Sequence, residues 1–102
     1  MKRFRVIISP GAQRELLAIR DYIAADAPER AIEYYDFLLD EIRELAVLPR
    51  RFPILLGVKG LGREIRYRTV GSYLVIFAVR DRSLYVLKVR HGGRRNSGLS
   101  LD

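Results

Sequence analysis

The chain has 102 residues, which suits one domain with a two-layer core and is too short for two domains. It contains no cysteine and no apolar run near the roughly 18 residues of a membrane span. This excludes disulfides, thiolate metal sites and a membrane-spanning helix, and it fits a cytoplasmic protein. The formal net charge of +7 is concentrated after residue 48, so we expect the second half to attract a polyanion or an acidic partner.

The first predicted elements are a short strand and a helix. Apolar residues at positions 4, 6 and 8 alternate with Arg3, Arg5 and Ile7, as in a strand with one buried face. Ser9 then offers an N-cap, and Pro10 suits the first helical position. Helical spacing predicts an amphipathic helix over residues 10–25, with a buried face of Ala12, Leu16, Ile19 and Ile23.

A second helix is predicted after a short connection at residues 26–29. Asp26 is a suitable N-cap, and Glu29 has the spacing of a capping box. Pro49 is expected to end the helix, because the residue before a proline avoids helical geometry. The short connection predicts an antiparallel helical hairpin. The buried face of the second helix is predicted to comprise Ala31, Tyr35, Leu38, Ile42 and Leu45.

Three strands are predicted in the second half, over residues 63–70, 73–80 and 84–91. Turn residues separate them at Gly71-Ser72 and at Asp81-Arg82-Ser83, which indicates an antiparallel meander. The predicted fold class is therefore α+β, in the order β-α-α-β-β-β, with a helical hairpin packed on one face of a four-stranded, mainly antiparallel sheet. Residues 1–95 are expected to form this single domain, and residues 96–102 a flexible C-terminal tail.

Strand alternation predicts which side chains share the sheet face turned away from the helices. The strand at 73–80 is apolar on both sides, so its second face needs a cover. We expect this face to have an apolar floor and a rim of Arg66, Arg68, Lys88 and Arg90. Further basic residues are expected at one end of the sheet (Arg80 and Arg82) and beyond the last strand (His91, Arg94 and Arg95). Arginine clusters suit phosphates or carboxylates, and an apolar floor suits a protein partner.

This sequence contains candidate residues for few kinds of catalytic reaction. The single histidine and scattered acidic residues predict no metal site, and no glycine-rich loop or nucleophile elbow is apparent, so no cofactor is expected. Acid–base cleavage of RNA has candidates: His91, Tyr85 or Tyr67 to move protons, and Arg66, Arg68 or Arg80 to stabilise the phosphate. In the structural alternative, His91 is hydrogen-bonded at the strand end and both tyrosines lie in the core.

Four segments of the chain resemble a known family. They are Ser9-Pro10 before a helix ending in Asp21-Tyr22-Ile23-Ala24, then Leu48-Pro49-Arg50, then Arg63-Glu64-Ile65-Arg66 leading to Val70-Gly71-Ser72-Tyr73-Leu74-Val75, and last Val89-Arg90-His91-Gly92-Gly93-Arg94-Arg95. In this order, over residues 4–95, they resemble the RelE/ParE superfamily of toxins from bacterial type II toxin–antitoxin systems. The opening of the first helix and the RHGGRR ending are closer to the ParE-like branch.

The resemblance implies a toxin that arrests growth when free and is neutralised by a cognate antitoxin, ParD-like or similar, laid over the apolar floor and its basic rim. For the ParE-like branch it implies inhibition of DNA gyrase. For the RelE-like branch it implies an endoribonuclease that cuts mRNA on the ribosome. A chain without toxicity that only binds an antitoxin is the third alternative, and a membrane partner is not expected.

The three alternatives leave open whether the chain is an enzyme. In an endoribonuclease, the catalytic residues are expected to be His91, Arg68, Arg80 and Tyr85. Contacts to the target or to the antitoxin are expected from Arg66, Arg68, Arg80, Arg82, Lys88, Arg90, Arg94 and Arg95.

Overall fold

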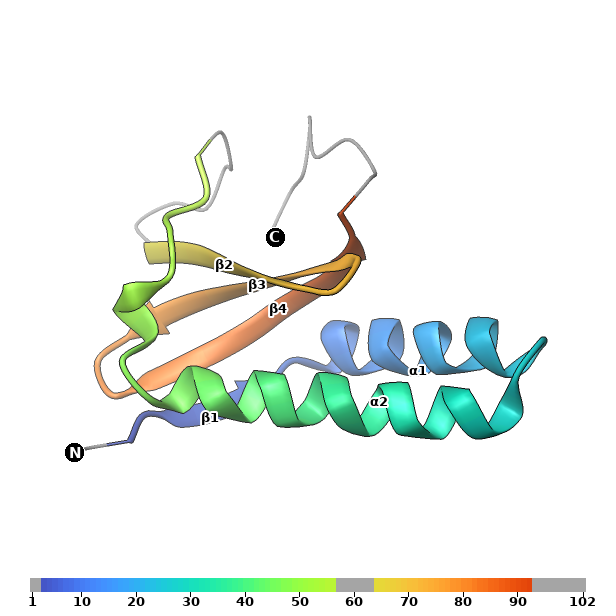
Figure 1. The fold of residues 1–102 in the computed structure, drawn as a ribbon. Coiled ribbons are helices and arrows are strands. Elements are labelled where there is room, and N and C mark those ends of the chain that lie inside the picture. The colour runs from blue at the N-terminus through green and yellow to red at the C-terminus, as the bar shows by residue number, and fades with distance from the viewer. Residues whose placement is uncertain (1–2, 57–63, 93–102) are drawn as a thin grey trace.

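The computed structural model describes residues 3–56 and 64–92. A helical hairpin covers one side of a four-stranded sheet, as predicted (Figure 1). The elements are β1 (Arg5–Ile8), α1 (Pro10–Ala24), α2 (Pro28–Arg43), the 3-10 turns η1 (Glu44–Ala46) and η2 (Pro49–Arg51), β2 (Glu64–Val70), β3 (Tyr73–Arg80) and β4 (Ser83–His91). The strand order is β1-β4-β3-β2, and β1 runs parallel to β4 while the other pairs are antiparallel.

The start of α1 follows the sequence prediction and also fastens the helix to the sheet. The Ser9 hydroxyl accepts a hydrogen bond from the N–H of Ala12 at 3.1 Å, and Pro10 opens the helix. The same hydroxyl lies 3.4 Å from the carbonyl oxygen of Leu87, to which it donates. The N-cap therefore joins the first turn of α1 to β4.

The boundaries of α2 differ from the prediction at both ends. Ala27, not Asp26, is the N-cap residue, and no side chain caps the helix. Because Pro28 opens the helix and has no N–H, one of the donors that a cap would satisfy is absent. Regular helix ends at Arg43, well before Pro49, and the chain continues through η1. The reversal before η2 is made at Leu48, whose φ of 48° lies in the left-handed region.

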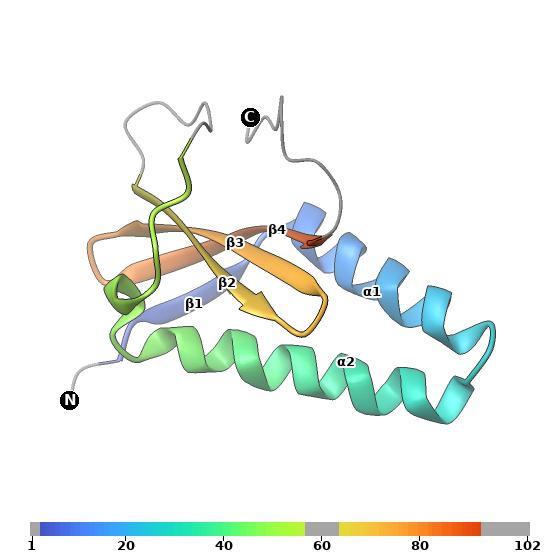
Figure 2. The ribbon, with the colours of Figure 1, turned by 45° about the horizontal axis from the view of Figure 1, so that its top comes forward.

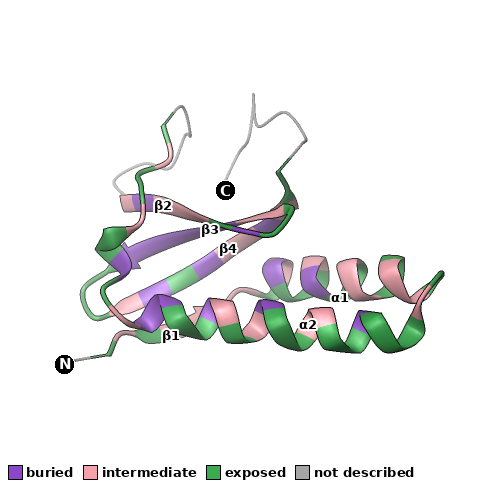
Figure 3. Cartoon of the chain, in the orientation of Figure 1, coloured by how far each residue is buried: buried purple, intermediate pink, exposed green. Residues whose placement is uncertain are grey.

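The main core lies between the helices and the sheet. Figure 3 shows the buried residues along the sheet and on the sides of the helices turned toward it. The helices contribute Ala12, Leu16, Leu38 and Ile42, η1 contributes Leu45, and the sheet contributes Val70, Val75, Phe77, Val79, Leu84, Val86 and Val89. Most of the predicted buried face of each helix is thus turned toward the sheet, with Ile19 and Tyr35 partly buried against this core, whereas the predicted Ile23 and Ala31 do not belong to it.

A smaller apolar cluster lies on the opposite side of the sheet. Ile65, Ile76 and Ala78 are buried there, so β3 is apolar on both faces, as the sequence predicts. The segment after η2 pairs along the outer edge of β2, where the N–H of Leu55 donates to the carbonyl of Ile65 at 2.9 Å. The Leu55 side chain packs against the cluster. Part of the cover that this face requires is therefore supplied by the chain itself.

Candidate functional site

A bulge in β4 decides which of its side chains reach the sheet face away from the helices. Leu87 is an extra residue on β4, where the pairing with β3 shifts by one position. Val86 and Val89 both point into the main core, although they are three residues apart. Lys88 and Arg90 follow the bulge and lie on the opposite face. Strict alternation over residues 84–91 would place Lys88 and Arg90 on the same face as Val86, and the bulge puts them on the opposite face.

Arg68 does not belong to the rim of that face. It pairs with Val75 of the main core and therefore points to the helix side of the sheet. Its guanidinium donates to the carbonyl oxygen of Glu41 at 2.7 Å and forms ion pairs with the carboxylates of Glu41 and Glu44. It also lies 5.3 Å from the centroid of the Phe52 ring. Arg68 thus tethers the C-terminal end of α2 to β2.

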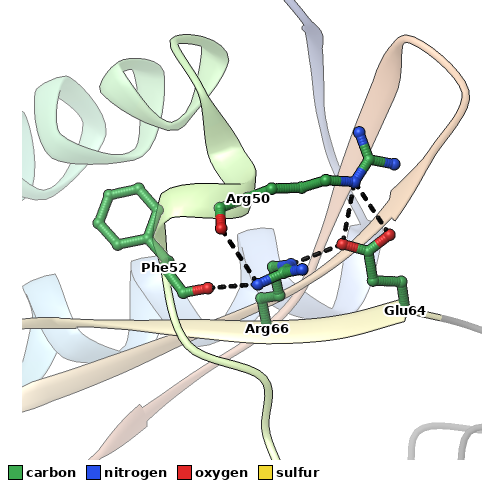
Figure 4. Close-up of polar contacts among 4 residues, drawn as sticks. All are labelled: Arg50, Phe52, Glu64 and Arg66. Carbon is green, nitrogen blue, oxygen red and sulfur yellow. Dashed lines mark hydrogen bonds and ion pairs between the residues drawn. The ribbon is translucent and has the colours of Figure 1, made fainter.

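Arg66 is likewise held on the helix side, by the segment that follows α2 (Figure 4). Its guanidinium donates to the carboxylate of Glu64 at 2.6 Å and to the carbonyl oxygens of Arg50 and Phe52 at 3.2 Å and 2.6 Å. Burial opposes ionisation of Glu64, but hydrogen bonds and positive charge from Arg66 and Arg50 outweigh it and hold the pKa of this carboxyl below its ordinary value. The prediction that Arg66 and Arg68 share a rim with Lys88 and Arg90 is wrong, because both pair with main-core residues of β3 and point to the helix side. Local acids and carbonyl groups occupy both guanidinium groups.

The open face, meaning the sheet side away from the helices, has an apolar centre and basic groups toward both ends of its strands. The centre comprises Ile7, Ile65, Tyr67, Ile76, Ala78, Tyr85 and Leu87. Lys88 and Arg90 lie toward one end, and Arg80 with Arg82 of the β3–β4 turn at the other. Arg5 joins the second group because it pairs with Ser83, which also pairs with Arg80. Arg5 was not among the predicted contact residues, although its alternation with Phe4, Val6 and Ile8 places it away from the core.

The four candidate nuclease residues do not converge on one site, although Arg80 and Tyr85 are diagonal neighbours on the open face. His91 is at the end of β4, with its ring 5.6 Å from that of Tyr73. Arg80 is at the far end of β3, about 23 Å from Tyr73 at roughly 3.3 Å per residue. Tyr85 lies in the centre of the open face, and Arg68 is on the helix side. Arg94 and Arg95 lie outside the described residues.

The helical hairpin extends beyond the sheet (Figure 2). A cleft of about 890 Å³ lies between the two layers at this end. Its walls come from both layers and comprise Glu15, Ala18, Ile19, Tyr22, Ile23, Tyr34, Ser72, Tyr73, Val89, Arg90 and His91. Glu15 accepts a hydrogen bond from the N–H of Val89 at 3.0 Å, and its other oxygen is 4.0 Å from Nε of Arg90. Tyr22 is 79% exposed, so an apolar ring is available at this hairpin cleft.

Tyr34 holds the β2–β3 turn against α2 at the floor of the hairpin cleft. Its ring lies 5.9 Å from the ring of Tyr73. Burial raises the pKa of the Tyr34 hydroxyl, as does the neighbouring Tyr73, while a hydrogen bond with the backbone of Ser72 opposes the rise. Gly71 in this turn has a φ of 56°, and a Cβ added there would lie 2.7 Å from the Tyr34 hydroxyl oxygen. The tight approach of turn and helix therefore requires glycine.

Comparisons with known proteins identify the class to which this architecture belongs. Residues 6–96 match the family model described as ParE toxin of type II toxin-antitoxin system, parDE. The chain is thus a type II toxin by family, and within that class it belongs to the ParE toxin family. The predicted resemblance to this branch of the RelE/ParE superfamily is confirmed.

A solved structure described as "Chromosomal ParDE TA system from P. aeruginosa" has the same fold, with a TM-score of 0.73 and 16% sequence identity over 87% of this chain and 96% of that chain. The search of curated proteins gives no match. Over residues 3–56 and 64–92, no helix is long and apolar enough to cross a membrane.

Proposed function

We propose that this chain is a cytoplasmic, growth-arresting toxin that inhibits DNA gyrase by binding and is silenced by a cognate antitoxin of the ParD-like kind. Membership of the ParE toxin family supports a toxin. The similar fold in a structure named as a ParDE system supports an antitoxin partner. The open face and the hairpin cleft present apolar and basic groups for which gyrase and the antitoxin would compete.

The dispersal of the candidate nuclease residues is the observation that carries this proposal. Cleavage of RNA needs a base, an acid and a cation within hydrogen-bond reach of one phosphate group. His91 and Arg80 stand at opposite ends of the β3–β4 hairpin, and Arg68 is occupied by Glu41 and Glu44 on the far side of the sheet. This arrangement supports inhibition by binding over cleavage by catalysis.

The antitoxin is proposed to use an acidic, partly apolar segment. Lys88 and Arg90 border the apolar centre of the open face, and Arg90 also lines the hairpin cleft. Tyr22 supplies an exposed ring at that cleft, and large aromatic rings are frequent anchors at protein interfaces. Arg66 and Arg68 are not assigned a contact with the partner, because their hydrogen bonds are made within the chain.

A supercoiling assay with purified toxin and gyrase tests the proposal. We expect loss of supercoiling that is restored by adding the antitoxin, and a weaker complex with antitoxin for the Lys88→Ala/Arg90→Ala variant. The Arg30→Ala/Arg43→Ala variant is the matched control, since it removes the same charge from exposed positions of α2. Full supercoiling at high toxin excess would refute the gyrase target.

Two further measurements separate the alternatives. Primer extension on translated mRNA that shows codon-linked cuts would establish the endoribonuclease instead. Harmless expression of the folded chain without antitoxin would establish a binding partner that lacks toxicity.

A further inference from the structure

We propose that one end of the sheet binds the phosphodiester backbone of duplex DNA. This basic end is defined by Arg3, Arg5, Arg80 and Arg82, all of which are exposed. It lies at the opposite end of the β3–β4 hairpin from the hairpin cleft, so it can act independently of a partner seated there.

Strand pairing brings these arginines together from distant parts of the sequence. Arg5 pairs with Ser83, and Ser83 pairs with Arg80, so the three residues form a row across three neighbouring strands. The N–H of Arg5 donates to the carbonyl oxygen of Arg82 at 2.8 Å, which fixes β1 against the β3–β4 turn. Two strand spacings separate Arg5 from Arg80, or about 10 Å. Backbone hydrogen bonding therefore fixes the positions from which these arginine side chains extend.

The charges of the basic end are not neutralised by the rest of the described chain. Arg50, Arg66, Arg68 and Arg90 make ion pairs with acidic residues, but within residues 3–56 and 64–92 no ion pair involves an arginine of the basic end. Asp81 is the single acidic residue in segments 3–5 and 80–83, which leaves a formal charge of +3. A concentrated positive charge of this kind attracts a polyanion.

The chemistry of the basic end favours a phosphate backbone over other acidic partners. Exposed guanidinium groups form forked hydrogen bonds with phosphate oxygens. A protein partner or a single strand usually needs apolar anchors or rings for stacking. In segments 3–5 and 80–83 the one ring is that of Phe4, which packs against the core under the guanidinium of Arg50. Tyr85, which is 37% exposed, follows Ser83 on the open face and is a diagonal neighbour of Arg5 and Arg80, so single-stranded RNA is tested as a separate arm.

Fluorescence anisotropy with a short duplex DNA of arbitrary sequence, titrated with salt, tests the proposal. Four phosphate contacts predict that log K falls with log salt at a slope of about −3.6. Arg5→Ala/Arg82→Ala is expected to reduce the slope to about −1.8 and to weaken binding roughly 60-fold at 0.1 M salt. Asp81→Asn should tighten binding, and asparagine tolerates the φ of 55° at this turn position.

The control is Arg14→Ala/Arg30→Ala, with the fold of every variant checked by circular dichroism. An equal loss in the control would overturn the proposal, because binding would then depend on total charge. Absence of binding, or binding of single-stranded RNA alone, would also overturn it. None of these outcomes bears on gyrase inhibition, which is measured separately.

Discussion

Replacement of Gly71 by alanine tests how closely the β2–β3 turn approaches α2. A non-glycine residue at a φ of 56° costs about 1–2 kcal/mol. The new Cβ would also lie 2.7 Å from the Tyr34 hydroxyl oxygen and displace it from Ser72, at a further cost of about 1 kcal/mol. We therefore expect the free energy of unfolding to fall by about 2–3 kcal/mol and Tm to fall by about 10–20 °C.

A double-mutant cycle with Tyr34→Phe isolates the contact. In the Tyr34→Phe background the nearest ring atom is Cζ at 3.9 Å, an ordinary contact, so Gly71→Ala should cost about 1 kcal/mol less there. Thermal and urea denaturation followed by circular dichroism measure both values. Gly11→Ala is the matched control, because its Cβ meets only the Arg14 side chain at 3.8 Å and the helix gains propensity. Equal costs of Gly71→Ala in both backgrounds would refute the reasoning about the Tyr34 hydroxyl.

Three more predictions concern how the layers are joined. Arg68→Met should lower the free energy of unfolding by about 1–3 kcal/mol, because it leaves the half-buried carboxylate of Glu41 unpaired. Denaturation experiments measure this value, and an unchanged denaturation midpoint would contradict the stabilising role of the Arg68–Glu41 ion pair. Glu64 has a lowered pKa in the fold, so its stabilising contribution is present above about pH 4.5 and is lost as the pH falls further. Glu64→Gln should therefore flatten the acid limb of a Tm-against-pH curve, and an unaltered limb would argue against the pairing with Arg66. Ser9→Ala should cost about 0.5–2 kcal/mol by removing the N-cap of α1, whereas Ser9→Asp, which restores a cap, should recover part of it.

The two sets of arginines in this chain have different roles, although they look alike in sequence. Arg66 and Arg68 are enclosed by acids and carbonyl groups, so their loss would be observed first as loss of stability. Arg5, Arg80 and Arg82 are exposed and make no ion pair within the described chain, so their loss would be observed as loss of binding. Toxicity assays of the first pair therefore need a stability measurement beside them.

Local signals in the sequence were sufficient for most of the secondary structure. The N-cap at Ser9, the apolar stripes of both helices and the turns at residues 71–72 and 81–83 act over a few residues, and the element order followed from them. They also led to the family resemblance. The predicted cap at Asp26 failed because Pro28 had already removed a donor that such a cap would satisfy.

Tertiary structure decided which residues make up the functional surface. The extra residue Leu87 in β4 reverses which side chains face the core after it. A bulge has no periodicity of its own, so the sequence pattern does not reveal it. Contacts between residues far apart in the chain pair Arg68 with Glu41 and place Arg5 beside the β3–β4 turn. The sequence by itself determined that this protein has a basic sheet. Only long-range pairing decided which arginines hold the fold together and which remain exposed.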